Sequence, residues 1–326
     1  MREKEIEFKV ITPVFSYGAD KKTPEIRMAS LKGVMRYTYR ITQQEVKREH
    51  LDQNEETEKL KTEPERLLFL ENQFLGDADK NISPVRLVLT NSLGISPSIG
   101  KPFLLHNKKR NERWNKVNCI EPEKNIQIRL SLRKNATENL ERYQALIELS
   151  LIIGGLGQRS RRGRGRIQNM FHHFKTREDA MKYITTQLNK ISETGNYDIA
   201  GNEIKPEKPA GNNVKRPVIQ KIIFGNIVKK QNGKPAWDAL LTKLDKASSA
   251  TKYEHDKNSN NNVRALGQIS GIRFSSSLIV GAVEIEEGLI PIYTQVRAVV
   301  KGRILDAENE WKSFIEEVEG KGGANS

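Results

Sequence analysis

The sequence predicts an α+β protein built from two ferredoxin-like (RRM-like, βαββαβ) domains with insertions, one over residues 1–175 and one over residues 176–326. A chain of 326 residues, 36% of them hydrophobic, is long for a single core, which favours two domains. The first 175 residues follow the order strand, helix, strand, strand, helix, strand, which is the split βαβ arrangement of this fold. The remainder carries a second set of strand and helix patterns that is compatible with the same fold.

The elements of the first domain follow from the spacing of apolar residues. Charged and apolar residues alternate over Glu5–Thr12, which is the period of a half-buried strand. Ser30 can cap a helix that runs through Tyr39, because the apolar residues after it recur at helical spacing. A charged stretch over 45–65 indicates an exposed helical extension or loop. The same criteria predict the other elements of this domain: a helix over 65–75, strands over 85–89 and 126–132, a helix over 138–153 and a strand over 166–174.

The second domain shows the same kinds of pattern. Residues 176–192 have helical spacing, whereas residues 195–217 are rich in Gly, Asn, Pro, Lys and Glu and indicate an exposed linker or long loop. The pattern then predicts these elements: a strand over 218–228, a short helix over 236–247, a strand pair over 272–284 and 289–299, and a closing amphipathic helix over 305–318.

The segment with the strongest chemical signal runs from Ile153 to Ile167, between a predicted helix and a predicted strand. It contains no acidic residue, and it carries five glycines and five arginines: Gly154, Gly155, Gly157, Gly163 and Gly165, and Arg159, Arg161, Arg162, Arg164 and Arg166. Glycine permits positive φ and close backbone approach, and the arginine fork of donors fits phosphate oxygens. The run matches neither the P-loop nor the dinucleotide-binding pattern. We expect a loop that binds the phosphates of a polynucleotide, with a solvated basic turn as the alternative.

A second basic element lies on the helix predicted after Ser30. Lys32, Arg36 and Arg40 are four residues apart and form one cationic stripe. A stripe of this kind is commonly a solvated face, but the split βαβ order can bring it beside the glycine-rich segment, where it would contact ribose phosphates. The net charge of +14 and the pI near 9.6 agree with a polyanionic partner, with nucleic acid ranked before an anionic membrane.

A third basic segment, 101–116, interleaves basic residues with one aromatic residue: Lys108, Lys109, Arg110, Arg113 and Trp114. Such a segment can hold a nucleic-acid backbone and stack a base, and a surface loop anchored by its Trp is an equal alternative. RNA-binding domains with a ferredoxin-like sheet usually carry exposed aromatic residues on two central strands. That signature is absent from this sequence, so we expect loops and helix ends, rather than the sheet face, to contact RNA.

Other features limit the classes of function. Cys119 is the single cysteine, which excludes an internal disulfide and a multi-cysteine zinc site and indicates a reducing compartment. No segment reads as a signal peptide or reaches the roughly 20 apolar residues that cross a bilayer, so we expect a soluble cytoplasmic protein without a membrane partner. The histidines lack metal-binding spacing and no catalytic carboxylate pair is apparent, so no metal, cofactor or catalytic residue is predicted. His172 and His173 would face opposite sides of a strand end, and ribonuclease chemistry using a His and a nearby Lys stays open.

The N-terminal half also contains a series of short motifs: Ile11–Phe15, Gly18–Asp20, Pro24–Arg27, Ser30–Tyr37, Glu71–Gly76 with Ser83–Arg86, and Gly154–Gly165. Together they resemble the CRISPR RAMP superfamily, and most closely its Cmr1 members. The last motif is similar to the glycine-rich loop of that superfamily. Glu71–Gly76 resembles its Phe-Gly segment, although Leu75 stands where Phe is commoner. The C-terminal half adds only a compatible length and topology.

The resemblance implies two ferredoxin-like domains and a place in a type III-B effector ribonucleoprotein, which uses a CRISPR RNA (crRNA) to find invading RNA. It further implies a position at the head of the complex, near the 3′ region of the crRNA and the 5′ part of the target, beside other Cmr/RAMP subunits. Members of this type are not thought to cleave RNA. We expect a non-catalytic RNA-binding subunit in antiviral defence. The alternatives are a Cas6-like metal-independent ribonuclease that processes guide RNA, and a chiefly structural subunit that docks onto acidic protein partners.

Overall fold

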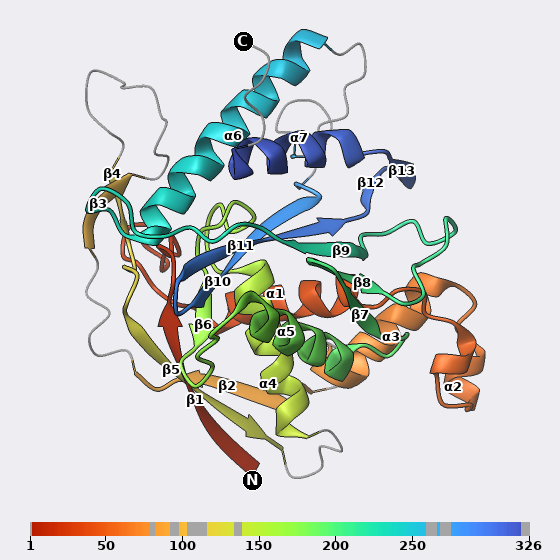
Figure 1. The fold of residues 1–326 in the computed structure, drawn as a ribbon. Coiled ribbons are helices and arrows are strands. Elements are labelled where there is room, and N and C mark those ends of the chain that lie inside the picture. The colour runs from red at the N-terminus through yellow and green to blue at the C-terminus, as the bar shows by residue number, and fades with distance from the viewer. Residues whose placement is uncertain are drawn as a thin grey trace.

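An antiparallel sheet near the N-terminus has the strand order of a ferredoxin-like domain (Figure 1). It contains β1 (Arg2–Val10), β2 (Val85–Leu89), β5 (Asn125–Leu132) and β6 (Ile167–Asn169), in the order β2-β5-β1-β6. The helices α1 (Met28–Thr42) and α4 (Leu140–Leu149) connect these strands in the predicted sequence of elements. The predicted fold class is therefore confirmed in this half. The computed structural model describes residues 2–77, 82–91, 98–102, 116–133, 139–258, 266–267 and 275–320.

Insertions between the strands of this sheet form separate small elements. A charged insertion contains a 3-10 turn (Arg48–His50), the short helix α2 (Glu55–Glu58) and α3 (Glu63–Leu75). Thr62 caps α3 with a capping box to Glu65, and the helix ends at Gly76 as predicted. The strands β3 (Ser98–Pro102) and β4 (Lys116–Cys119) pair only with each other among the described residues, and the sequence did not predict them.

The second sheet has the order β10-β11-β9-β8-β7. Its elements are α5 (Arg177–Ile191), β7 (Tyr197–Ala200), β8 (Glu203–Pro206), β9 (Ile219–Phe224), α6 (Ala236–Asn258), β10 (Leu278–Ile285), β11 (Gly288–Val296), β12 (Ala298–Val300), β13 (Arg303–Leu305) and α7 (Glu308–Glu319). The run β9-α6-β10-β11-α7 is a ferredoxin-like unit that lacks its last strand. The place of that strand beside β9 is taken by β8, which comes from the hairpin upstream in the chain.

Several predicted elements differ in their bounds from the structure, and three of the differences are large. Residues 195–217 were expected to be a loop, but β7 and β8 form a hairpin there because the Tyr197 hydroxyl donates to Thr42 O at 2.6 Å and so fixes the hairpin to the end of α1. The strand predicted over 166–174 stops at Asn169, whose side chain accepts the backbone amide of Phe171 and turns the chain. The helix predicted over 236–247 continues to Asn258.

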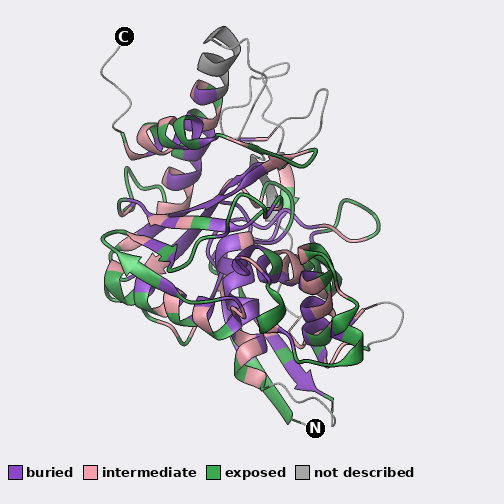
Figure 2. Ribbon diagram, turned by 90° about the vertical axis from the view of Figure 1, so that its right-hand side faces the viewer, coloured by how far each residue is buried: buried purple, intermediate pink, exposed green. Residues whose placement is uncertain are grey.

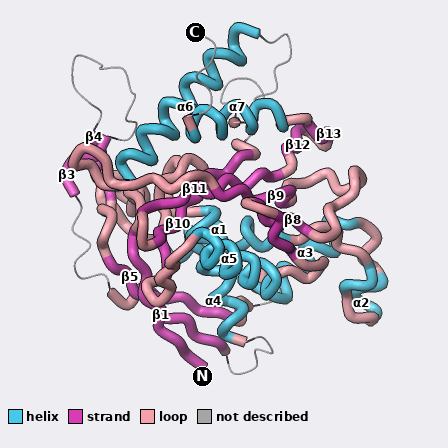
Figure 3. Tube along the Cα trace, in the orientation of Figure 1, coloured by secondary structure: helices cyan, strands magenta, loops and turns pink. Residues whose placement is uncertain are grey.

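The two sheets share one continuous hydrophobic core. Residues of β1, such as Phe8, and residues of β10 and β11, such as Ile279 and Ile292, belong to the same buried cluster. Figure 3 shows α1, α4 and α5 between the strands of the two sheets, and α6 and α7 on the far side of the second sheet. A second buried cluster, including Leu244 and Phe314, fills the space beneath α6 and α7. Buried residues accordingly concentrate in the strands and the helix faces that meet them (Figure 2).

Candidate nucleic-acid interface

A π-helical segment, Ser150–Gly154, joins α4 to the glycine-rich loop (residues 154–165) and fixes where that loop begins. The amide of Gly155 donates to Ser150 O at 2.8 Å, across five residues. π-Helical turns occur frequently at functional sites. This one leaves the carbonyl oxygens of Ile152 and Ile153 for other donors, and the Arg166 guanidinium donates to both.

Arg164 and Arg166 lie inside the fold, which corrects the expectation that they contact phosphates. Arg166 is 0% exposed and donates also to Ser160 O and to Val280 O of β10, the latter at 2.6 Å. Arg164 is 1% exposed and pairs with Asp245 of α6 at 2.6 Å. Burial lowers the pKa of Arg166 to about 9, so this side chain stays charged at neutral pH. Both guanidinium groups are held by this chain, so a polynucleotide on the surface does not reach them in this conformation.

Arg161 and Arg162 are half-buried and connect the loop to the second sheet. The Arg161 guanidinium donates to Ser276 O, and its central carbon lies 4.6 Å from the centre of the Tyr37 ring. Arg162 donates to Ser276 Oγ at 3.2 Å, and its backbone forms a parallel bridge with Val280 of β10. Burial lowers the pKa of Arg162 to about 10. Part of each donor set is therefore used within the fold, while Arg159 is exposed at the tip of the loop.

Two glycines of the loop are required by close backbone approach. Gly157 has a φ of 83°, and a Cβ atom there would lie 2.6 Å from Phe15 O. Gly165 has a φ of 69°, and a Cβ atom there would collide with Leu156 O. Because L-residues rarely adopt this backbone conformation and both sites lack space, the glycines shape the loop itself. They place its open part, around Gln158, against the segment that follows Phe15.

The stripe of Lys32, Arg36 and Arg40 is largely engaged within the protein, which was not expected. Glu71 of α3 is fully buried and accepts from Arg36 at 2.7 Å and from Arg40 at 2.8 Å. Lys32 donates to Val85 O at 3.2 Å. Sequence reasoning missed Glu71, although its position within the apolar stripe of α3 was a signal that it would be buried. The stripe therefore holds α3 and β2 against α1, and only part of its charge faces solvent.

The start of α1 remains open to solvent. Arg27 is the N-cap residue and its side chain does not cap the helix, and the first turn contains no acidic residue, so Ser30 is not the cap that was predicted. An open hollow of about 520 Å³ lies here and is lined by Arg27, Lys21 and Gln158. Within the described part of the chain, no carboxylate pairs with Lys21 or Arg27. A helix N-terminus beside unpaired cations is a site that attracts anions.

A second hollow of about 270 Å³ lies between α1 and the loop, one turn further along the helix. Ser30 and Tyr37 line it from α1, and Ser160 and Arg161 line it from the loop. The first hollow is lined by Arg27 at the start of α1 and by Gln158 of the loop, close in sequence to Ser30 and Ser160 of the second hollow. The two hollows therefore follow one seam between α1 and the loop. Together they form the candidate interface, and they contain only part of the residues that the sequence indicated.

Two cations, Lys32 of α1 and Arg159 of the loop, are both buried in part and close to other cations. Burial lowers the pKa of Lys32, and the neighbouring charges of Arg36 and Arg133 lower it further. Burial also lowers the pKa of Arg159, with the charge of Arg164 adding to the shift. A cation whose pKa falls through such repulsion lies in a positive field. Of the two, only Arg159 adjoins the first hollow, because its neighbour Gln158 lines that hollow.

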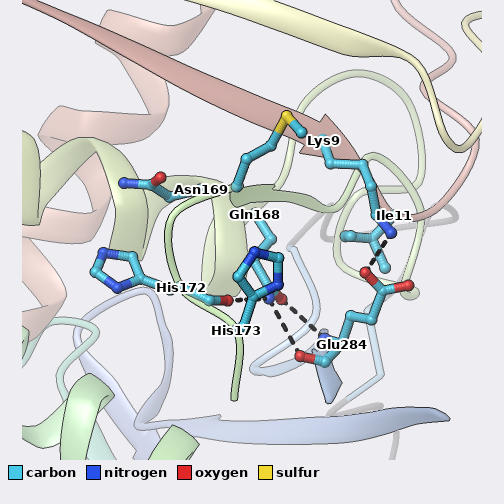
Figure 4. Close-up of a pocket in the computed structure, with 8 residues that line it drawn as sticks. Lys9, Ile11, Gln168, Asn169, His172, His173 and Glu284 are labelled. Atoms are coloured by element: carbon cyan, nitrogen blue, oxygen red, sulfur yellow. Dashed lines mark hydrogen bonds and ion pairs between the residues drawn. The ribbon is translucent and has the colours of Figure 1, made fainter. Parts of the chain in front are cut away.

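The histidines of the ribonuclease hypothesis lie at a different place (Figure 4). His173 lines a hollow of about 110 Å³ together with Lys9 and Glu284, whereas the His172 ring points in a different direction, 3.7 Å from Glu148. Burial alone would lower the pKa of Lys9, but its hydrogen bond to Glu284 and the charges of Glu284 and a second glutamate outweigh burial and raise it. Lys9 is thus held protonated and partly neutralised, which makes it a poor proton acceptor.

The remaining expectations concern the basic segment 101–116, a metal site and a membrane span. The basic residues and the tryptophan of segment 101–116, Lys108 to Trp114, lie outside the described residues. In the ranges that the structure describes, no group of three His, Cys, Asp or Glu side chains could hold a metal ion. Among the described helices, none has both the length and the apolar character that a bilayer span requires.

Comparison with known proteins adds family and fold. A family model described as the RAMP superfamily matches residues 7–168, and no curated protein sequence matches the chain. The fold is similar to that of Cmr1 from Pyrococcus furiosus in its apo form, with a TM-score of 0.55 and 18% identity over 97% of this chain and 96% of that chain. It is also similar to a chain of a type III-B Cmr-beta complex bound to cognate target RNA and AMPPnP, with a TM-score of 0.54 and 11% identity over 96% and 98%. At these identities the likeness shows a shared fold.

Proposed function

We propose that this chain, which belongs to the RAMP superfamily through its residues 7–168, is a non-catalytic RNA-binding subunit of a type III-B CRISPR effector complex. The end-to-end likeness to Cmr1, and to a chain of a Cmr complex bound to target RNA, supports a subunit of this kind. Its partners would be crRNA near its 3′ region, target RNA and other Cmr subunits, in cytoplasmic antiviral defence.

The seam between α1 and the glycine-rich loop is the place where we expect RNA to bind. The single observation that carries the proposal is the open N-terminus of α1 beside Lys21 and Arg27, neither of which forms an ion pair with a described carboxylate. The exposed Arg159 lies in the loop between Gln158, which lines the first hollow, and Ser160, which lines the second. Backbone amides and cations of this kind bind phosphate oxygens without reading the base. RNA would therefore be held mainly through its backbone, with affinity that falls as salt is added.

The site residues of this proposal differ from those that composition favoured. Arg164 and Arg166 are excluded by burial, and pairing with Glu71 uses part of the donors of Arg36 and of Arg40, whose side chain is 49% exposed. Lys21 and Arg27 replace them. These two residues escaped sequence reasoning because Lys21 belongs only to the pair Lys21–Lys22 in a turn-rich segment, and Arg27 has no basic neighbour.

The test is a charge-matched pair of double variants. Lys21→Ala with Arg27→Ala should weaken binding of single-stranded RNA and reduce the slope of log K against log salt by about 0.7 for each lost phosphate contact. Lys208→Ala with Lys215→Ala removes the same charge from an exposed loop near the other end of α1 and should leave the slope unchanged. Equal effects of the two double variants would show that only the net charge matters, and would refute this interface.

The ribonuclease alternative has one observation in its favour, since His173 and Lys9 line the same hollow. Against it, Lys9 is tied to Glu284 and to Glu123, and the two histidine rings do not converge. Incubation of the purified protein with repeat RNA in EDTA separates the two functions. Accumulation of a product that His173→Ala abolishes would establish the enzyme and remove the non-catalytic assignment.

A further inference from the structure

The second hollow of the seam differs in chemistry from the first. Its most deeply buried lining residue is Ile279, at 1% exposure, and the half-buried Val34 and Tyr37 add further apolar surface. Ser30 and Ser160, which are more exposed, add hydroxyl groups. No carboxylate lines it. A cavity with apolar walls and a few polar groups suits a flat, largely apolar group better than a phosphate.

Two of the lining side chains, Tyr37 and Arg161, form a cation–π pair, which we call the Tyr37–Arg161 surface. The Arg161 guanidinium lies over the Tyr37 ring at 4.6 Å, and its donation to Ser276 O holds it in place. Bases that leave their stack are held on aromatic rings and on guanidinium planes, and hydroxyl groups hydrogen-bond their edges. The hollow therefore offers the components that hold one unstacked base.

Gly33 gives an independent indication that this space is left for a ligand. It lies within α1, is exposed, and lines the hollow, and a Cβ atom built on it would meet nothing within 4 Å. A glycine inside a helix destabilises it by roughly 0.5–1 kcal/mol relative to alanine. Neither positive φ nor protein packing explains a glycine at this position, whereas a group that lies against the helix surface would.

We propose that this hollow holds a single unstacked nucleobase of the bound RNA, stacked against the Tyr37–Arg161 surface and lying over Gly33. The inference rests on the proposed function and deepens it. The RNA backbone would follow the α1 N-terminus at Arg27, and one base would turn inward one helical turn further on. Binding would then depend on the base as well as on the phosphates, without strong preference among bases, because every base has a π-face.

The test compares oligouridylate with an abasic ribose-phosphate oligomer of the same length, so that no binding register needs to be known. The wild-type protein should prefer oligouridylate by roughly 5- to 150-fold, the range expected for one base stacked on an aromatic group. Gly33→Leu fills the hollow from a position that has free space and should abolish this preference. Ala29→Leu places the same side chain at an exposed position of α1 that does not line the hollow, and should retain the preference.

Photo-crosslinking gives a second readout. RNA containing 5-iodouridine should crosslink to the peptide containing Tyr37 in the wild type and in Ala29→Leu, and not in Gly33→Leu. Thermal melting should show that Gly33→Leu is folded, because replacing an exposed helical glycine removes its helix penalty.

The outcomes separate this inference from the proposed function. If both oligomers bind, if Lys21→Ala with Arg27→Ala weakens both equally, and if Gly33→Leu keeps the preference for oligouridylate, then the base site is refuted and the interface stands. If neither oligomer binds with salt-dependent affinity, the interface and the base site are refuted together.

Discussion

Replacing Asp245 should destabilise the protein more than it affects RNA binding, because Asp245 neutralises the buried Arg164. The two side chains are 4% and 1% exposed, and Arg164 Nη2 lies 2.6 Å from Asp245 Oδ2. The other hydrogen bond described for the guanidinium is a weak one to Arg162 O at 3.3 Å, and its Nε has no partner within the described part of the chain. Asp245→Ala therefore leaves a charge in the interior with almost nothing to solvate it. Removing one member of a buried pair costs about 3–5 kcal/mol.

A double-mutant cycle measured by urea denaturation tests that value. Asp245→Ala should lower the free energy of unfolding by about 3–5 kcal/mol, and Arg164→Met should lower it by a smaller amount because methionine keeps most of the packed volume. Combining Arg164→Met with Asp245→Ala should recover part of the loss caused by Asp245→Ala, since no unpaired charge is then left in the interior. The expected coupling energy is at least about 2 kcal/mol.

The second half of this experiment concerns RNA. Arg164→Met should leave both the RNA affinity of the folded protein and its salt slope unchanged, because Arg164 does not reach the surface. A coupling energy below about 0.5 kcal/mol would refute the structural assignment. So would a fall of about 0.7 in the salt slope without a change in stability, since that is the effect of losing a phosphate contact.

Three further outcomes follow from the described contacts. Gly165→Ala should cost roughly 2–5 kcal/mol of unfolding free energy, since positive φ and overpacking add at this site, whereas Gly33→Ala should be neutral or stabilising; urea midpoints compare them. Glu71→Gln should cost about 1.5–3 kcal/mol by the same assay, because Arg36 loses a charged acceptor. The Asp20 carboxylate accepts hydrogen bonds from the hydroxyl and the amide of Thr23, which lower the pKa of Asp20 to about 2. These bonds stabilise the turn above about pH 4, and the stabilisation is lost as the pH falls towards 2. An NMR titration of the Asp20 carboxyl with a midpoint near 3.8 would contradict this.

Local pattern was sufficient for most of the fold because most elements bury one regular face. The strand 85–89 was predicted at its observed bounds and the helix 65–75 at its observed end, since their apolar residues recur with the period of the element. The largest failure depends on a contact between residues distant in sequence. The hairpin β7-β8 was read as a loop because its composition is turn-rich, and it is held by Tyr197, which bonds to the end of α1. A pattern read over a few neighbouring residues cannot show this contact, because Tyr197 and the end of α1 are far apart in the sequence.

The candidate site was harder to predict than the fold. Composition located the glycine-rich loop correctly, but it could not distinguish a guanidinium that faces solvent from one that is buried. The missing information lay in two acids, Glu71 and Asp245, each of which stands within the apolar face of a helix. A buried carboxylate needs a cationic partner, and arginine is the residue best suited to supply one. An acid in an apolar stripe is thus a signal that some arginines of a basic protein are structural.

The buried arginines also explain why an arginine-rich loop is needed even where it does not contact RNA. The π-helical turn before the loop leaves two carbonyl oxygens, and β10 presents a third, all of which converge on Arg166. A guanidinium has five donors in a fixed plane and can serve several carbonyls at once, whereas a lysine ammonium has three on a flexible stem. The loop is therefore rigid because its arginines join the first sheet to the second. These contacts hold Arg161 over Tyr37 beside the second hollow, so the buried arginines of this segment would support the proposed interface without contacting RNA themselves.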